Sequence, residues 1–223
     1  MAEGANCKQI MRELAALDEP TARKINAENG DDHGVNLSKL RAIAKRLKTQ
    51  HELAQSLWAT GDTAARLLAT LIAKPKAFSE DELDAMIKDI RSPKLLDWFV
   101  QNLVKPSRHA EALRVRWKEG SDFVGRAGWS LTTDCVAKDA DSLDLDALLD
   151  QIEKQMKRAP ERKQWAMNHC LAMIGIHHAK QRKRAIAIGK KLEVLKDYPA
   201  SPGCTPPYAP VWIEEMVRRR ATT

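Results

Sequence analysis

The sequence lacks any long apolar run. Nowhere in its 223 residues does a stretch approach the ~20 apolar residues that a membrane-spanning helix needs. The first 14 residues, MAEGANCKQIMREL, carry an acid at position 3 and no continuous apolar segment, which argues against a secretory signal. Four cysteines are too few for a disulfide scaffold. We therefore expect a reduced, cytoplasmic protein that makes no contact with a membrane.

Signatures of cofactor and metal chemistry are also missing. The sequence has no P-loop and no Gly-x-Gly-x-x-Gly motif. It has no Cys-x-x-Cys pair, and its C-terminal His and Cys residues lack the spacing of a zinc site; these are His169, Cys170, His177, His178 and Cys204. We expect no metal and no cofactor. A Cys–His nucleophile pair remains open, although no motif supports it.

Strand patterns are nearly absent, and residues 191–195 are the one stretch that could be extended. Apolar residues instead recur three and four positions apart, as on one face of a helix. Leu40, Ile43, Ala44 and Leu47 show this spacing. Similar patterns cover residues 53–58, 64–72, 83–90, 95–103, 112–117, 123–135, 145–156, 165–174 and 178–188. The sequence thus predicts ten or so helices of roughly 10 to 16 residues.

Cap and breaker residues mark the ends of these helices. Five side chains that suit an N-cap precede the apolar patterns: Asn36, Asp62, Ser79, Ser92 and Ser121. Glu82 stands three residues after Ser79, as in a capping box. Gly175 and Gly189 are expected to end the helices predicted at 165–174 and 178–188. Residues 134–150, with six aspartates, are expected to form mostly an acidic linker and a helix start.

Two-helix units recur every 30 to 40 residues, which is typical of stacked helix pairs of the HEAT kind. We predict an all-α fold of antiparallel helix pairs stacked in a curved right-handed superhelix, with residues 1–223 forming a single domain. An irregular helical domain is the alternative. Residues 197–220 are expected to form a Pro-rich loop and a short helix, packed by Trp212, Ile213 and Met216.

Positive charge is concentrated near the C-terminus. Residues 151–223 hold 15 Lys and Arg against 6 Asp and Glu, whereas residues 1–150 hold 22 against 24. Residues 180–191 alone contain six basic residues and no acid. Such a distribution indicates a polyanion as partner. A solvated basic face without a partner is the alternative.

Three segments carry a resemblance to a known family. They are GVNLSKLRAIAKRLKTQHELAQSLWATGDTAARLLATLIAKP (34–75), RVRWKEGSDFVGRAGW (114–129) and WAMNHCLAMIG (165–175), the last followed by AIAIGKKLEV and GCTPPYAPVWIEEMV. In order and spacing they resemble the DNA alkylation repair family, the HEAT-like-repeat DNA glycosylases and their relatives. The resemblance covers most of residues 34–217. It implies a superhelix of paired helices whose concave, basic inner face holds duplex DNA.

The resemblance also implies a chemistry. Excision of a cationic alkylated purine leaves an oxocarbenium-like sugar, which a nearby carboxylate stabilises. Aromatic faces against the same sugar favour positive charge as well. In the family, a Trp and an Asp stand four residues apart on one helix, so both project to one face. A later helix supplies a second Trp, and Arg side chains hold the phosphates.

Carried over to this chain, the family pattern is incomplete. The catalytic carboxylate falls on Asp97, and the phosphate-holding Arg falls on Arg126. The first Trp falls on Pro93, the second on His169, and a second Arg on Ala172. His169 could partly replace an aromatic wall, although as a cation it would repel the developing sugar charge. A shifted alignment would use Trp98 or Trp165 instead.

Each of these side chains also has a structural alternative. Asp97 could cap a helix or pair with Lys94 or a neighbouring helix, Arg126 could form an interhelical salt bridge, and Asn168 could bond a neighbouring helix. Four tryptophans lie on apolar stripes and are expected in the core: Trp58, Trp117, Trp129 and Trp165. The basic run could be a solvated face.

We expect a DNA-binding helical-repeat protein that acts as a monomer on double-stranded DNA and excises cationic alkylpurines. The alternative is a non-catalytic scaffold for DNA structures or a protein partner. Asp97 is the candidate catalytic residue. The candidate DNA-binding residues are Arg126, Arg162, Lys163, His169, Arg182, Lys183 and Arg184.

Overall fold

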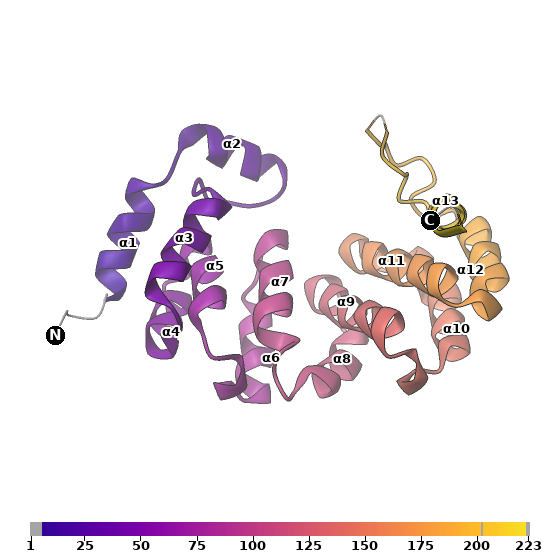
Figure 1. Ribbon diagram of the computed structural model, residues 1–223, viewed down its shortest axis with the longest axis horizontal. Helices are drawn as coiled ribbons and strands as arrows, with labels where there is room; N and C mark the ends of the chain where they lie inside the picture. The colour runs from indigo at the N-terminus through magenta and orange to yellow at the C-terminus, as the bar shows by residue number, and fades with distance from the viewer. Residues whose placement is uncertain (1–5, 202, 222–223) are drawn as a thin grey trace. The chain divides into compact units, whose positions relative to one another are not determined.

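Helices form nearly all of the regular structure. The computed structural model describes residues 6–201 and 203–221 (Figure 1), and within these ranges the one β contact is an isolated bridge between Asp18 and Val35. The described residues group into two compact units, an N-terminal unit that ends at Glu111 and a C-terminal unit that starts at Ala112. The all-α prediction is confirmed. None of the described helices is long and apolar enough to cross a bilayer.

The N-terminal unit contains seven α-helices among its described residues. They are α1 (Cys7–Ala16), α2 (Pro20–Glu28), α3 (Leu37–Leu47), α4 (His51–Ala59), α5 (Thr63–Ile72), α6 (Glu80–Lys88) and α7 (Pro93–Phe99). Short helical turns, η1 (Pro75–Ala77) and η2 (Val100–Val104), follow α5 and α7. Helix α5 packs against α3 and α4, and seven of its ten residues are buried at the centre of the unit.

Capping side chains set the helix starts in this unit as predicted. Asn36 and Asp62 accept from backbone N–H groups in the first turns of α3 and α5. Ser79 and Glu82 form a complete capping box at α6. These bonds satisfy N–H groups that have no partner inside the helix. In the C-terminal unit, Ser121 is the N-cap residue of α9 as predicted, but its side chain makes no cap hydrogen bond.

The C-terminal unit is built on two long helices. Helix α9 (Asp122–Lys138) packs along α11 (Glu161–His177), and α8 (Ala110–Lys118) precedes α9. The turn η3 (Ala140–Ser142), helix α10 (Leu145–Gln155) and the turn η4 (Met156–Arg158) connect the two. Helices α12 (Ala179–Leu192) and α13 (Ala209–Ala221) then pack on α11. Ile213 is fully buried, and Trp212 and Met216 pack against the same core, as predicted for the last helix.

Two glycines expected to end helices lie inside them. A Cβ on Gly175 would come within 2.5 Å of the Ile213 side chain, and one on Gly189 within 2.7 Å of the Pro210 ring. Both glycines therefore allow α13 to approach α11 and α12 closely. Because α12 runs on to Leu192 and turns follow it, the extended stretch predicted at 191–195 is also wrong.

Tryptophan burial follows the apolar stripes in three of four cases. Trp58, Trp117 and Trp129 lie in the core. Trp165 is only half-buried, and its ring meets Tyr198 edge to face, with centroids 4.9 Å apart. The core prediction is wrong for Trp165 because its position on α11 faces the Pro-rich segment.

Candidate nucleic-acid interface

The helix that carries Asp97 is fixed at its first turn by a buried carboxylate. Ser92 caps α7 by accepting from the Leu95 N–H at 3.0 Å, and its hydroxyl donates to Asp31. The Asp31 carboxylate also accepts from the Lys94 N–H at 3.3 Å. Asp31 and Ser92 are buried. A negative charge at a helix N-terminus is favourable, so the start of α7 is held against the segment after α2.

Asp97 lies on the exposed side of α7. Because Ser92 occupies the cap position, the capping alternative for Asp97 is wrong. The neighbouring Trp98 is half-buried, and the guanidinium of Arg41 lies 4.9 Å above its ring. Pro93, where the family places a Trp, is the first residue of α7. Asp97 is thus an exposed residue on the second turn of this helix, without an aromatic side chain four residues earlier.

Helix α7 continues into a π-helical segment. The Lys105 N–H donates to the Val100 carbonyl at 2.9 Å, the five-residue spacing of a π turn. Within this segment Asn102 donates to the Thr70 hydroxyl at 3.2 Å, which ties it to α5. π turns inside helices occur frequently at functional sites. The helix bearing Asp97 is therefore held at both ends.

The GRAGW motif on α9 is mostly a packing motif. A Cβ on Gly128 would lie 2.1 Å from the Lys118 backbone nitrogen, so α8 and α9 are in close contact there. A Cβ on Gly125 would lie 2.5 Å from the Gly120 carbonyl oxygen. Trp129 is fully buried. Arg126 is the long polar side chain of the motif and is half-buried on α9.

Two predicted phosphate contacts at the start of α11 are engaged within the chain. Lys163 is buried, and its ammonium group donates to the Gly120 carbonyl at 2.8 Å. Burial lowers its pKa. Arg162 forms an ion pair with Asp122 at 3.3 Å and lies 4.5 Å above the Phe123 ring. Both side chains therefore join the start of α11 to the α8–α9 turn.

A hollow of about 380 Å³ opens beside these residues. Lys154, Arg158 and Lys163 contribute basic side chains to its lining, together with Pro160 and Glu119. Pro160 precedes α11 without a side-chain cap bond, as Ser121 does at α9. Within the described ranges, the side chains of Lys154 and Arg158 make no hydrogen bond or ion pair. Lys154 and Arg158 are not among the predicted DNA-binding residues, although they belong to a short basic run, KQMKR, at 154–158.

In the basic run on α12, some side chains bind other groups of the unit and others lie in solvent. Arg182 donates to the carbonyls of Gly175 and Ile176 at 2.8 and 3.3 Å and so satisfies the end of α11. Lys183 is exposed and makes no ion pair with any described residue.

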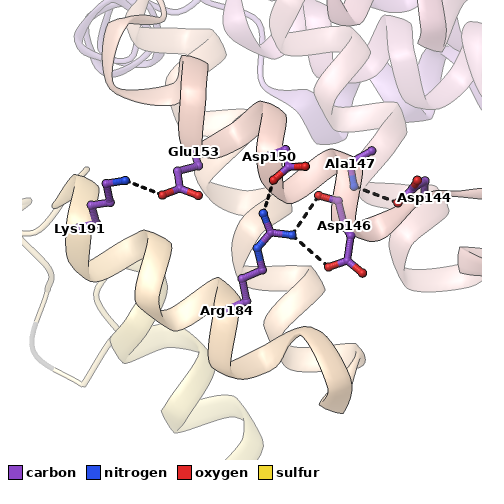
Figure 2. Close-up of polar contacts among 7 residues, drawn as sticks. All are labelled: Asp144, Asp146, Ala147, Asp150, Glu153, Arg184 and Lys191. Atoms are coloured by element: carbon purple, nitrogen blue, oxygen red, sulfur yellow. Dashed lines mark hydrogen bonds and ion pairs between the residues drawn. The ribbon is translucent and has the colours of Figure 1, made fainter.

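Arg184 and Lys191 connect α12 to the acidic helix α10. Arg184 contacts the carboxylates of Asp146 and Asp150, the former at 3.1 Å (Figure 2). Lys191 pairs with Glu153 at 2.6 Å. The aspartates predicted as an acidic linker therefore lie partly on a helix that faces a basic one. Much of the local charge is matched within the unit.

His169 lies at the surface of α11, stacked on Trp212 with centroids 5.2 Å apart and planes within 9°. Partial desolvation of the ring lowers its pKa, which favours the neutral imidazole over the cation that would repel a developing sugar charge. Ala172 is fully buried, so the position of the second family Arg presents no side chain to a phosphate.

The cysteine beside this histidine is not a nucleophile. Cys170 is fully buried, and burial raises the pKa of its thiol to about 12. The thiolate is the reactive form, so Cys170 is inert near neutral pH. No group of three or more metal-ligating side chains occurs among the residues that the structure describes.

These observations define a helical-repeat protein with a basic C-terminal unit. The sequence pattern of the DNA alkylation repair enzymes matches residues 10–213. This chain therefore belongs to the DNA alkylation repair enzyme family, as the resemblance implied.

Two relatives extend the comparison. A solved structure described as "A new family of proteins related to the HEAT-like repeat DNA glycosylases with affinity for branched DNA structures" is 28% identical. It superposes with a TM-score of 0.79 over 97% of this chain and 95% of its own, which confirms the HEAT-like fold. The uncharacterized protein Lin0241 of Listeria innocua serovar 6a is 22% identical over 220 residues, 95% of this chain and 97% of that protein.

Proposed function

We propose that this chain binds double-stranded DNA, with a preference for branched structures, through the basic surface of its C-terminal unit, and that it does so as a cytoplasmic monomer. The relative with affinity for branched DNA supports this, because the likeness covers nearly the whole of both chains. The observation that carries the proposal is the hollow at the first turns of α9 and α11, where Lys154 and Arg158 have no partner among the described residues.

Phosphate binding at this hollow follows from its chemistry. Helix N-termini present backbone N–H groups and a partial positive charge to an anion. Lys and Arg side chains add charge-assisted hydrogen bonds to phosphate oxygens. The Glu119 carboxylate at the rim accepts a hydrogen bond from Gln151 at 2.9 Å. Three basic groups against one carboxylate leave the hollow positive, and such a site binds the DNA backbone without reading sequence.

The test is a binding measurement with the purified chain. Fluorescence anisotropy compares a labelled four-way junction with a linear duplex of the same length at one salt concentration. We expect tighter binding of the junction. Lys154→Ala should weaken junction binding about tenfold, the effect of one charged hydrogen bond.

Lys138→Ala is the matched control. It removes the same charge from an exposed lysine of the same unit, one that pairs with Asp134 at 3.0 Å. We expect native affinity for this variant. Equal weakening by both substitutions would mean that net charge, and not the hollow, sets affinity. Equal binding of junction and duplex by the native chain would contradict the preference for branches.

A second function, excision of cationic alkylpurines, is favoured by Asp97. Its carboxylate is exposed on a helix that is fixed at both ends, as a group that stabilises a developing sugar cation must be. Pro93 and Ala172 replace the first Trp and the second Arg of the family, so we expect only weak release of alkylpurines. In this proposal Arg126 holds a phosphate and the neutral His169 stands at the place of the second Trp.

Release of methylated purines from alkylated duplex tests this second function. An electrostatic stabiliser acts mainly in the transition state. Asp97→Asn should therefore abolish purine release, with unchanged or slightly better affinity for undamaged duplex. No release by the native chain would leave the chain a DNA-binding protein only. Equal release by Asp97→Asn would remove the role of Asp97 and point to Trp98 or Trp165.

A further inference from the structure

The C-terminal unit exposes an aromatic pair that its core does not need. Tyr198 is 48% exposed, an unusual degree for a large ring, and it meets the half-buried Trp165 with the ring planes at 90°. Edge-to-face geometry leaves ring surface of the pair uncovered.

The pair is held in place by the Pro-rich segment. The buried Asn168 of α11 donates from its side-chain amide to the Pro207 carbonyl at 2.8 Å, which ties the segment to α11 one turn from Trp165. The Tyr198 N–H donates to the Leu195 carbonyl at 3.3 Å in the turn after α12. The segment is thus tied to α11 near its C-terminal end, and Tyr198 follows a hydrogen-bonded turn at the other end.

The pair belongs to a row along α11. Arg162, Trp165 and His169 are spaced by three and four residues and so lie on one face of the helix. Arg162 covers the Phe123 ring, and His169 stacks on Trp212. A guanidinium, an uncovered aromatic pair and a second stacked pair therefore follow one another on the surface.

We propose that Trp165 and Tyr198 form a stacking platform for an unpaired nucleobase at a DNA branch point. This inference rests on the proposed binding of branched DNA. Aromatic side chains bind unstacked bases through their π-faces, and a nearby arginine accompanies the phosphate. Branch points supply such bases at little cost, whereas a fully paired duplex does not. A protein partner that inserts an apolar side chain is the other occupant that the test must separate.

The experiment uses the full chain and two probes. One is a three-way junction with two unpaired nucleotides at its branch, one of them 2-aminopurine, whose fluorescence falls when it stacks. The other is a fully paired linear duplex of equal length. Tyr198 is exposed, so Tyr198→Ala leaves the core intact. We expect Tyr198→Ala to weaken junction binding by about 5- to 150-fold and to abolish quenching, with duplex binding unchanged.

Three further variants make the result specific. Tyr198→Phe keeps the ring and should behave as native. Tyr198→Leu keeps an apolar side chain but no aromatic face, so it should lose junction binding and quenching as Tyr198→Ala does. An apolar pocket for a protein side chain would instead remain functional in Tyr198→Leu. Val211→Ala removes another exposed apolar group, 41% exposed on α13, and should change nothing.

The outcomes that overturn the platform are distinct from failure of the proposed function. Native quenching and native affinity in Tyr198→Ala would overturn the platform alone, as would equal losses on junction and duplex. A native chain that binds neither DNA would overturn the proposed function, and the platform with it.

Discussion

The two units have the same kind of fold and different surfaces. The N-terminal unit carries 17 Lys and Arg against 16 Asp and Glu, and the C-terminal unit 20 against 14. Seven of the eleven Phe, Trp and Tyr residues belong to the C-terminal unit. Packed helix pairs need an apolar face and leave the outer face free to vary. The two units therefore differ in surface chemistry. We propose DNA binding by the C-terminal unit because it has the larger excess of basic residues.

A count of charges alone overstates this difference. Arg184 and Lys191 are matched by carboxylates of α10, and Lys163 and Arg182 donate to backbone carbonyls. The charge that remains for a partner lies on side chains without such contacts, among them Lys154, Arg158 and Lys183. A basic run in a sequence is thus a weaker guide to a ligand than the contacts of each cation.

The largest expected effect is on the free energy of unfolding, and it separates a glycine of the C-terminal unit from one of the N-terminal unit. Gly128→Ala places a methyl group 2.1 Å from backbone of α8, which only a shift of the helices can relieve. We expect a loss of about 3 kcal/mol of unfolding free energy. Gly61→Ala in the N-terminal unit meets nothing within 4 Å and costs only about 1 kcal/mol, through its positive φ of 78°. Urea unfolding measures both, and equal losses would contradict the close helix contact at Gly128.

The next largest effect is on the salt dependence of DNA affinity, which should differ between variants of the C-terminal and the N-terminal unit. If about four phosphates are neutralised, the slope of log affinity against log salt is about −3.6. Removing two contacts with Lys154→Ala/Arg158→Ala should bring it to about −1.8. Lys24→Ala/Lys45→Ala takes two exposed charges from the N-terminal unit and should leave the slope unchanged. A flat response in the native chain, or equal changes in both variants, would break the assignment of DNA to the C-terminal unit.

The sequence predicted the helices better than their ends or their surface. Apolar spacing found most helices after residue 34 because burial of one face fixes the 3.6-residue period. It gave no signal for α1 and α2, where Ile10 and Leu14 are the only buried side chains of α1 and α2 has none. A helix end is the local prediction at Gly175, because the contact that requires a glycine there is made with Ile213 of α13, 38 positions further on.

The candidate site was harder to predict than the fold. The residues carried over from the family can be located, but their partners come from other helices. Nothing in the sequence pairs Arg184 with Asp150, or Lys163 with the Gly120 carbonyl. The contact between Trp165 and Tyr198 joins residues 33 positions apart, and the bond from Asn168 to the Pro207 carbonyl is likewise long-range, so the local sequence carries no signal for either.

A smaller effect is expected from the ion pairs between α10 and α12. Arg184→Ala removes contacts with two exposed carboxylates, and water screens such pairs. We expect a loss of about 0.5 kcal/mol, or a melting temperature lower by about 1–2 °C, at low salt. The difference should shrink in 1 M salt because screening weakens the native pair. Lys183→Ala, next to it on α12, should leave the melting temperature unchanged. DNA binding that falls with unchanged stability in Arg184→Ala would instead make Arg184 a phosphate contact.

The smallest effect concerns the pH dependence of the C-terminal unit. The pKa of His169 lies below its ordinary 6.5 because stacking on Trp212 partly desolvates the ring, and that of His177 is lowered by burial and then by Arg220 and His178. Between the folded pKa and 6.5 the unfolded chain binds a proton that the folded chain does not. The contribution of these two histidines to the free energy of unfolding is therefore full above pH 6.5 and falls as the pH drops through that window. His169→Gln removes one such group, so its melting temperature should fall less between pH 7.5 and 5. His177→Gln is the companion variant for the second histidine. An NMR titration of the His169 ring checks the cause directly, and a midpoint at or above 6.5 would show that stacking on Trp212 leaves the imidazole fully hydrated.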